Sequence, residues 1–449
     1  MYLTMDAYRK VEHHGRMAYI VHIAYRLYDV DVPDLGDAES KKTVEFTPRT
    51  TGKTRPANLI EQMPVLYWAD RTLWTEANVW LAFRATLIRS GELAMATVYG
   101  DSWSLLTYAN WLEETNSSWS EFGFRRSSRP TVRFRGYLID RRDSGDRMSS
   151  KTASQRMGVV IAFYRWLLES RLFDPEYPPF RQSPFKVTAE DKFGLGRTIT
   201  GISADLSIPA GHTRVIRLEG GLQPVDDNTR SQILELAKNY CSAEFSLMLQ
   251  IGFFTGMRLQ SILDLKIRTI EDFISSRSEK YCYLRIGPKF GVSTKNSVDG
   301  QVLMPNDLRV RLREYAYSVR RLRREAKAIE GDKGLLFLTK SGRRYANRGL
   351  DRSPTVNVDM GRLRTVARAH GLNLNGFYFH CTRATFGTSI VSAGMVTKSV
   401  SLKLIIGTLR DLLFHADERT SLLYIKYFES QKVRIKYEEQ YSAWLFGTL

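Results

Sequence analysis

Apolar residues recur every three or four positions in two stretches of the first half of the chain, the spacing of one face of an α-helix. The first stretch begins at Asp101 or Ser102, either of which can cap a helix. Its apolar face comprises Leu105, Tyr108, Ala109 and Leu112. The second stretch spans residues 149–170, with an apolar face of Met157, Val160, Ile161, Tyr164 and Leu168. Two amphipathic helices predict a helical domain, to which we assign residues 76–185.

The segments on either side of this helical domain have other patterns. Residues 16–32 show a mixed β-type pattern, and residues 33–56 are polar and contain glycine and proline. We therefore expect residues 1–75 to form a small N-terminal module or arm. Four prolines between residues 173 and 184 end the helical pattern. The following run is glycine-rich with little periodicity, and we interpret residues 186–223 as a linker.

Helical and strand patterns alternate in the second half of the chain. Asp226, Asp227 or Asn228 can cap a helix that ends at Tyr240, and an apolar helix follows until Gly256 lets the chain break. Further segments are a β-hairpin over 281–305, a long helix over 306–329, a short strand and turn over 332–346, and a basic helix over 360–372. The long helix has its apolar stripe at Leu308, Leu312, Tyr315, Val319, Leu322 and Ala326. The sequence predicts a mainly α fold with a small β-hairpin or sheet, in which a mixed α/β domain covers residues 224–449.

The charge of the chain favours a polyanionic partner. Lys and Arg number 66 against 48 Asp and Glu, a net charge of +18 with a pI near 9.7, and the excess is spread along all 449 residues. This balance favours nucleic acid before membrane, although a protein that is merely basic is the simpler alternative. The most apolar run, residues 245–254, is too short to span a bilayer. The N-terminus has no signal-peptide pattern, so we expect a cytoplasmic, nucleoid-associated protein.

The residues between the first two helices are rich in arginine. Residues 129–147 are expected to form a connector whose polar edge lies on a phosphate backbone. The candidate DNA-binding residues are Arg133, Arg135, Arg141 and Arg142. For any one of them, a solvated surface position is an equally good interpretation.

Cysteine and histidine give no sign of a metal site. Cys241, Cys282 and Cys381 are far apart and form no CxxC pair, so neither a disulfide framework nor zinc is indicated. His13 and His14 are adjacent, but no carboxylate or cysteine stands at ligand spacing from them, which favours surface histidines. We expect a reducing compartment, no metal and no cofactor.

Candidate chemistry gathers near the C-terminus. His380 and Arg383 are three positions apart and share one helical face, and His415 and Tyr424 follow, nine positions apart. A permanent cation, two imidazoles and a phenol can bind and attack a phosphate. Arg258, just after Gly256, could face the same cleft, although an arginine there is more often a capping or surface residue.

The order of these motifs resembles the tyrosine recombinase family, the phage and mobile-element integrases. The motifs are TGMR at 255–258, a lysine-bearing hairpin, HCTR at 380–383 and LLFHADERTSLLY at 412–424, in which the tyrosine follows the histidine by nine positions as in the family. The resemblance covers residues 224–449. The helical segment at 76–185 also resembles the core-binding domain that such enzymes place upstream.

The resemblance implies a role for each motif residue. Arg258 and Arg383 would hold the scissile phosphate, Tyr424 would attack phosphorus, His380 would act as base or proton relay, and His415 would donate a hydrogen bond to the phosphate. Lys295 would protonate the departing 5′-oxygen, with Lys289 as the alternative lysine. Tyr427 is the rival nucleophile. The nine-residue spacing from His415 favours Tyr424, so Tyr427 is expected to be a packing residue.

Some positions depart from the family pattern. Ser261 stands where an acidic residue usually follows the first arginine, with Asp264 the nearest carboxylate. Ala384 replaces a frequent histidine and Phe414 a usual glycine. The 32 positions from Arg383 to His415 exceed the family interval, so we expect an insertion within residues 395–411.

The resemblance implies a site-specific recombinase or integrase of a mobile element that cleaves and rejoins double-stranded DNA through a 3′-phosphotyrosyl link. It also implies a homotetramer on two DNA sites, with accessory DNA-bending proteins as further partners. The tail, residues 433–449, could anchor on a neighbouring protomer through Tyr441, Trp444, Leu445 and Phe446, or fold back on its own domain. A type IB topoisomerase or resolvase and a catalytically inactive DNA-binding protein are the alternative functions.

Overall fold

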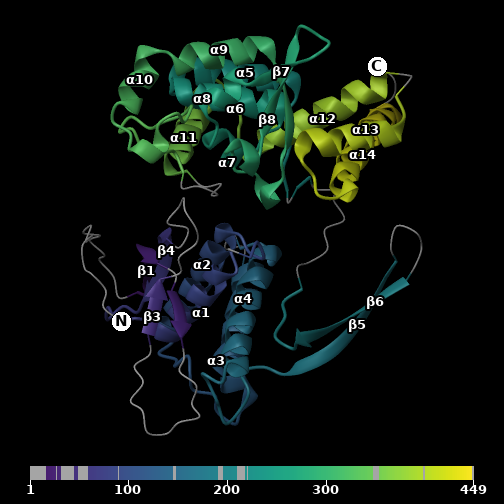
Figure 1. The fold of residues 1–449 in the computed structure, drawn as a ribbon. Coiled ribbons are helices and arrows are strands. Elements are labelled where there is room, and N and C mark those ends of the chain that lie inside the picture. The colour runs from purple at the N-terminus through teal and green to yellow at the C-terminus, as the bar shows by residue number, and fades with distance from the viewer. Residues whose placement is uncertain are drawn as a thin grey trace. The chain divides into compact units, whose positions relative to one another are not determined.

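A computed structural model describes the chain in two compact units, residues 1–212 and 213–449 (Figure 1). The described residues are 17–26, 28–31, 45–48, 59–88, 90–144, 148–190, 196–209, 218–219, 221–346, 353–397 and 400–446. Each unit has its own hydrophobic core. The fold is mainly α with small antiparallel sheets, which confirms the predicted fold class.

The helices of the first unit are α1 (Thr75–Thr86), α2 (Met95–Glu114), α3 (Pro130–Asp143) and α4 (Ser150–Glu169). The predicted helix over 149–170 is confirmed as α4, because the Ser149 side chain accepts a hydrogen bond from the Thr152 N–H and so caps the first turn. Its inward face carries Met157, Val160, Ile161 and Tyr164 as predicted, and Leu167 rather than Leu168.

The start predicted for the other helix was wrong. Asp101 does not cap α2, since its carboxylate lies 2.9 Å from the guanidinium of Arg84 and is buried inside the bundle. Val98 is buried one helical repeat before Leu105, so the apolar face continues upstream and the helix begins at Met95.

The arginine-rich stretch is a helix rather than a connector. Pro130 occupies the first turn of α3, where its missing N–H costs nothing, and Phe134 and Leu138 are buried on one face. The apolar face of this helix is short, and the charged residues around it concealed the helical pattern in the sequence.

The strands of the first unit are β1 (Tyr19–Arg26), β2 (Tyr28–Asp31), β3 (Glu45–Pro48), β4 (Leu59–Tyr67), β5 (Gln182–Glu190) and β6 (Gly196–Ala204). β1 pairs antiparallel with β4, from Tyr19 opposite Tyr67 to Arg26 opposite Leu59. The Glu113 carboxylate on α2 accepts hydrogen bonds from the N–H groups of Ala18 and Ala69. The β1–β4 pair therefore shares the core of the helices and is not a separate module.

The predicted linker contains regular structure. β5 and β6 pair antiparallel along their whole length, from Gln182 opposite Ala204 to Glu190 opposite Gly196, and form a hairpin most of which lies within residues assigned to the linker (Figure 1). Ala204, Leu206 and Ile208 then pack into the core of the first unit. Short alternating strands in a glycine-containing run gave too weak a pattern to be recognised.

The helices of the second unit are α5 (Asp227–Tyr240), α6 (Ala243–Thr255), α7 (Leu259–Leu263), α8 (Ile267–Glu271), α9 (Asn306–Ala316), α10 (Val319–Glu325), α11 (Pro354–Ala369), α12 (Cys381–Val396), α13 (Leu402–Leu413) and α14 (Glu418–Phe446). The Asp226 side chain caps α5, as predicted, by accepting the Thr229 N–H. The strands are β7 (Phe273–Ser275), β8 (Tyr281–Ile286) and β9 (Gly300–Pro305). They form one sheet in the order β7-β8-β9, so the predicted hairpin is confirmed and a third strand extends it.

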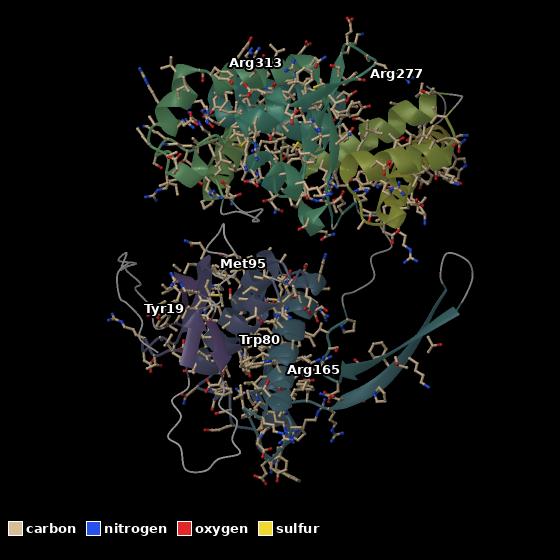
Figure 2. All side chains as sticks on the ribbon, viewed as in Figure 1. Tyr19, Trp80, Met95, Arg165, Arg277 and Arg313 are labelled. Atoms are coloured by element: carbon tan, nitrogen blue, oxygen red, sulfur yellow. The ribbon has the colours of Figure 1, made fainter. Side chains whose placement is uncertain are left out.

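The long helix predicted over 306–329 was wrong because the chain breaks at Ser318. The Ser318 side chain accepts the Arg321 N–H and starts a new helix, which shifts the phase of the apolar stripe. Val319 and Leu322 are exposed instead, while Arg321 is fully buried and pairs with Glu325. The outer face stays basic, as the exposed Arg313 on α9 illustrates (Figure 2).

The strand predicted within residues 332–346 is a further prediction that was wrong. Residues 332–346 contain no regular strand among those described, and Leu335 makes only an isolated bridge with Lys266. The interval predicted to hold an insertion includes the end of α12 and most of α13, and the insertion itself stays a prediction. Among the described residues, no helix has the length and apolarity needed to cross a membrane.

Candidate active site

Arg258 is positioned by a sharp break between α6 and α7. Gly256 ends α6 with a φ of 67°, the left-handed conformation that glycine adopts most easily. A Cβ atom at this position would also lie 2.5 Å from Cδ1 of Phe386. Arg258 follows as the first residue of the next turn, with 12% of its side chain exposed.

Arg383 lies in the first turn of α12 and is 1% exposed. Its two terminal nitrogens donate to main-chain carbonyls, Nη1 to Gly256 at 2.8 Å and Nη2 to Leu413 at 2.6 Å. These bonds tie together the ends of α6, α12 and α13. They also fix the guanidinium so that Nε points at a further acceptor.

His415 and Tyr424 come from the end of α13 and from α14. The Nδ1 atom of His415 lies 2.9 Å from Oγ of Ser421, and its ring centroid lies 5.8 Å from that of Tyr424. Tyr424 is fully buried, and the close approach of Gly387 makes room for its ring. The nine-residue spacing thus brings both side chains to one place.

All four side chains converge on Glu219. Its Oε1 atom lies 2.8 Å from the Tyr424 hydroxyl, 2.9 Å from His415 Nε2 and 3.0 Å from Arg383 Nε. Its Oε2 atom lies 3.8 Å from a terminal nitrogen of Arg258. Leu218 and Leu222, both in the core, pair across a turn that presents Glu219 to the cluster.

Burial and the neighbouring charges set the ionisation of this cluster. Burial alone would raise the pKa of Glu219, but the hydrogen bond from His415 and the charge of Arg383 outweigh it and hold that pKa far below its ordinary value. Burial, and next the Glu219 charge, raise the pKa of Tyr424 well above that of a free phenol. The cluster thus contains an anionic carboxylate and a neutral phenol.

Burial lowers the pKa of His415 below its ordinary value despite the hydrogen bond to Glu219, which favours the neutral imidazole. A carboxylate can only accept hydrogen bonds, so Nε2 of His415 carries a proton and donates a hydrogen bond to Glu219. Nδ1 then accepts the hydroxyl proton of Ser421. The Nε2–H group of His415 can therefore donate a hydrogen bond to an anion that occupies the position of the Glu219 carboxylate.

The other predicted catalytic residues stand in different settings. His380 is half-buried at the N-terminal end of α12, one turn before Arg383. Lys295 is exposed in a short 3-10 turn between β8 and β9. Lys289 is also exposed, with its Nζ atom 3.7 Å from Asp299. Tyr427 is half-buried against the core of the second unit.

The residues at two of the departures from the family pattern make defined contacts in the structure. Ser261 donates to the carbonyl of Ser293, and Asp264 accepts hydrogen bonds from the Ser293 N–H and hydroxyl, so both fasten the loop after β8. Phe414 adopts a left-handed conformation with a φ of 52°, and its ring lies against Gly300 of β9.

Sequence reasoning missed Glu219. It lies within residues interpreted as a linker, and the local signal is a leucine on either side of the sequence Glu-Gly-Gly. Nothing in so short a pattern connects it with side chains on α12 and α14.

The predicted DNA-binding arginines lie on α3. Arg133 donates to the Ser117 hydroxyl and stacks over the Trp111 ring at 5.6 Å, and Arg141 donates to the Tyr137 hydroxyl. Arg142 pairs with Asp143, and Arg135 is half-buried. Cation stacking on aromatic rings holds two of these groups in fixed orientations on the helix.

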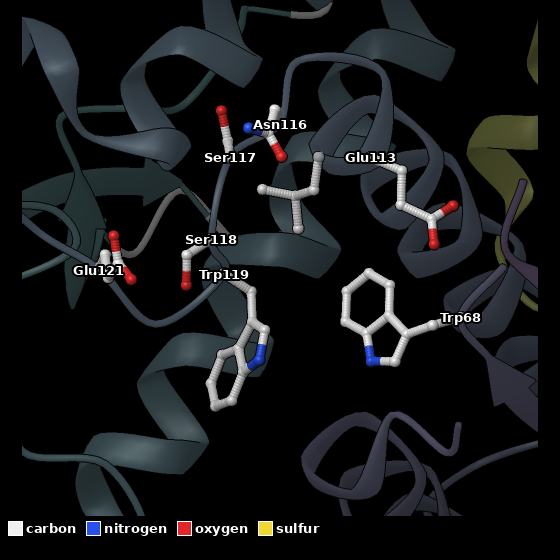
Figure 3. Close-up of a pocket in the computed structure, with 8 residues that line it drawn as sticks. Trp68, Glu113, Asn116, Ser117, Ser118, Trp119 and Glu121 are labelled. Carbon is white, nitrogen blue, oxygen red and sulfur yellow. The ribbon is translucent and has the colours of Figure 1, made fainter. Parts of the chain in front are cut away.

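A separate hollow lies in the first unit (Figure 3). It is lined by Trp68, Leu112, Glu113, Asn116, Ser117, Ser118, Trp119 and Glu121. Because Glu113 is committed to the backbone of Ala18 and Ala69, the hollow is part of the packing between α2 and the β1–β4 pair. Among the described residues, no group of three or more His, Cys, Asp or Glu side chains is arranged to hold a metal ion.

No protein-family model matches the chain, and no curated protein sequence matches it. The solved structures that it resembles include tyrosine recombinases and integrases. The XerH site-specific recombinase bound to difH substrate is 15% identical, with 73% of this chain and 75% of that chain covered and a TM-score of 0.43. The Tn1549 transposon integrase with circular intermediate DNA is 15% identical, with 77% and 94% covered and a TM-score of 0.44. Lambda integrase bound to DNA is 10% identical, with 75% and 90% covered and a TM-score of 0.41.

Proposed function

We propose that this protein is a site-specific DNA recombinase that cleaves and rejoins DNA strands through a 3′-phosphotyrosyl intermediate. The observation that carries the proposal is the convergence of Tyr424, His415, Arg383 and Arg258 on a single anionic group. A phosphodiester bears one negative charge shared by two oxygens, as a carboxylate does. A pocket that surrounds a carboxylate with two guanidinium groups, an N–H donor and a phenol is suited to bind and attack a phosphodiester.

The chemistry that we propose assigns one step to each group. The Tyr424 oxygen attacks phosphorus while His380 takes its proton, and the bond from phosphorus to the 5′-oxygen breaks. Lys295 gives a proton to that oxygen, which leaves a free 5′-hydroxyl. Arg258, Arg383 and His415 stabilise the charge on the non-bridging oxygens. A second 5′-hydroxyl then attacks the phosphorus of the phosphotyrosyl link and releases the tyrosine. The energy of the cleaved phosphodiester bond is thus retained in the covalent link until the strands are rejoined.

Double-stranded DNA is the proposed substrate. The net charge of +18 supports a polyanionic partner, and the arginines of α3 offer phosphate contacts on the first unit. We assign the activity to a mobile element and to the cytoplasm.

We further propose assembly as a homotetramer on two DNA sites, joined by the tail. Exposed apolar side chains follow one another at helical spacing along the end of α14, at Val433, Tyr437, Tyr441 and Trp444. Trp444 is 75% exposed, which supports docking on another protomer over folding back. The side chains of Leu445 and Phe446 lie outside the described residues.

A nicked suicide duplex from the ends of the element that carries the gene tests the proposal. Wild type should form a covalent protein–DNA adduct that is visible by denaturing electrophoresis, since the nick lets the 5′-hydroxyl fragment leave. Tyr424→Phe should form none, and Tyr427→Phe should form it as wild type does. Absence of adduct with wild type would favour the inactive DNA-binding protein, and an adduct with Tyr424→Phe would exclude this nucleophile.

The products separate the remaining alternative. A recombinase should yield joined strands from two duplexes that carry the sites, as measured by the size of labelled DNA. Relaxation of supercoiled DNA without strand exchange would instead indicate a topoisomerase or resolvase.

A further inference from the structure

We infer that Glu219 is an internal competitor of the DNA phosphate, so that the protein without DNA holds its own active site closed. The inference rests on the proposed function, because it concerns the same pocket. Glu219 lies in the second unit, shortly after the division at residue 213. Its side chain is 11% exposed, which means that the carboxylate is enclosed by the cluster rather than standing at its edge.

The donors that Tyr424, His415 and Arg383 present to the pocket are already used. Oε1 of Glu219 is within 3.0 Å of the Tyr424 hydroxyl, His415 Nε2 and Arg383 Nε. The remaining nitrogens of Arg383 are bound to the carbonyls of Gly256 and Leu413. A phosphate oxygen therefore has no access to these groups while Glu219 is present, and a second anion at this distance would also be repelled.

A supporting role for Glu219 during the reaction fits the geometry less well. A carboxylate in contact with the Tyr424 hydroxyl stands where the hydroxyl must meet phosphorus. As a base it would be weak, because its pKa is far below its ordinary value while that of Tyr424 is raised. Asp264, the carboxylate nearest to Arg258 in sequence, accepts hydrogen bonds from Ser293, whereas Glu219 is the carboxylate in contact with Tyr424.

The turn that carries Glu219 is built to hold it in this position. Leu218 and Leu222 are buried in the core, and the N–H groups of Gly221 and Leu222 both donate to the Leu218 carbonyl. Glu219 itself has a φ of 33°, a conformation that side chains rarely adopt. A residue held against such a preference by buried neighbours indicates a position that the fold enforces.

DNA can displace Glu219 because it binds at many points. Contacts along the duplex deliver the scissile phosphate to the pocket at high effective concentration, whereas a free phosphate ion must compete unaided. The closed site would protect Tyr424 from reaction until a complete DNA site is bound.

The affinity of the protein for inorganic phosphate reports whether Glu219 occupies the pocket. In calorimetric titrations at constant ionic strength, Glu219→Ala should bind phosphate at least about tenfold more tightly than wild type, because the competing carboxylate is gone. Adding Arg258→Ala should abolish this gain. Glu330→Ala removes an exposed carboxylate of the same unit and should bind as wild type does. Equal affinity in wild type and Glu219→Ala, or a gain that survives Arg258→Ala, would overturn the inference.

Adduct formation on the suicide duplex gives the second readout. Glu219→Ala and Glu219→Gln should each form adduct about tenfold faster than wild type, and Glu330→Ala at the wild-type rate. Glu219→Gln keeps the size of the side chain, so it serves if the smaller variant folds poorly. Slower adduct formation in both variants would mean that Glu219 supports catalysis, and the inference would be wrong.

The two readouts separate this inference from the proposed function. Tighter phosphate binding by Glu219→Ala without adduct from any variant would uphold the occupied pocket and reject the recombinase. Suppose instead that adduct formation depends on Tyr424, while Glu219→Ala neither binds phosphate more tightly nor forms adduct faster than wild type. This result would support the recombinase and show that Glu219 does not compete with the phosphate.

Discussion

Tyr424 depends on the absence of one side chain on the neighbouring helix. A Cβ atom at Gly387 of α12 would lie 2.3 Å from Cε1 of Tyr424, so the ring or the helix would have to move. We expect Gly387→Ala to slow adduct formation at least about a hundredfold, since a displacement of about 1 Å at a reacting group can cost that much. We expect it also to cost about 1–3 kcal/mol of unfolding free energy through overpacking.

Gly361 provides the matched control at the residue scale. It lies within α11, and a Cβ atom there would meet nothing within 4 Å. Gly361→Ala should raise the unfolding free energy in urea by up to about 1 kcal/mol, because alanine favours a helix. If Gly387→Ala behaves in the same way, the contact with Tyr424 does not constrain the ring.

At the scale of elements, β9 and the end of α13 meet through one contact. Phe414 occupies a left-handed position at the C-terminus of α13, and its Cε1 atom would lie within contact distance of any Cβ atom at Gly300. This contact joins the sheet, whose loop carries Lys295, to the segment that carries His415. The two motifs are therefore coupled through packing between elements.

A double-mutant cycle tests that coupling. Gly300→Ala should destabilise the wild type by about 1–3 kcal/mol, because the methyl group meets the Phe414 ring. In a Phe414→Ala background the same substitution should cost much less, with a coupling energy of about 1–2 kcal/mol from denaturant unfolding. Additive effects of the two substitutions would show that the ring does not bear on Gly300.

At the scale of the whole molecule, the two units have separate cores. Phe163 lies in the core of the first unit and Phe253 in that of the second, both with 2% or less of their surface exposed. Scanning calorimetry should therefore resolve two transitions. Phe163→Ala should lower one of them and Phe253→Ala the other, each with a cost of about 3–5 kcal/mol. One transition that both variants lower equally would mean that the chain unfolds as a single unit.

Features with a strong local signal were predictable from the sequence. The apolar stripe of α4, the Asp226 cap of α5, the glycine break before Arg258 and the β8–β9 hairpin all follow from residues a few positions apart. Predictions from local propensity were wrong where a cap or an ion pair with another residue changed the local structure. Ser318 restarted the helix phase and buried Arg321, and Arg84 drew Asp101 into the bundle.

The sequence by itself determined which chemical groups could act and in what order they occur, because motif spacing is a local property. Only the tertiary structure decided that Arg258, Arg383, His415 and Tyr424 meet at one point, and that Glu219 stands there. Glu219 contacts residues 164 to 205 positions away in the chain. Such contacts depend on how α6, α12, α13 and α14 pack, which no pattern confined to one element contains.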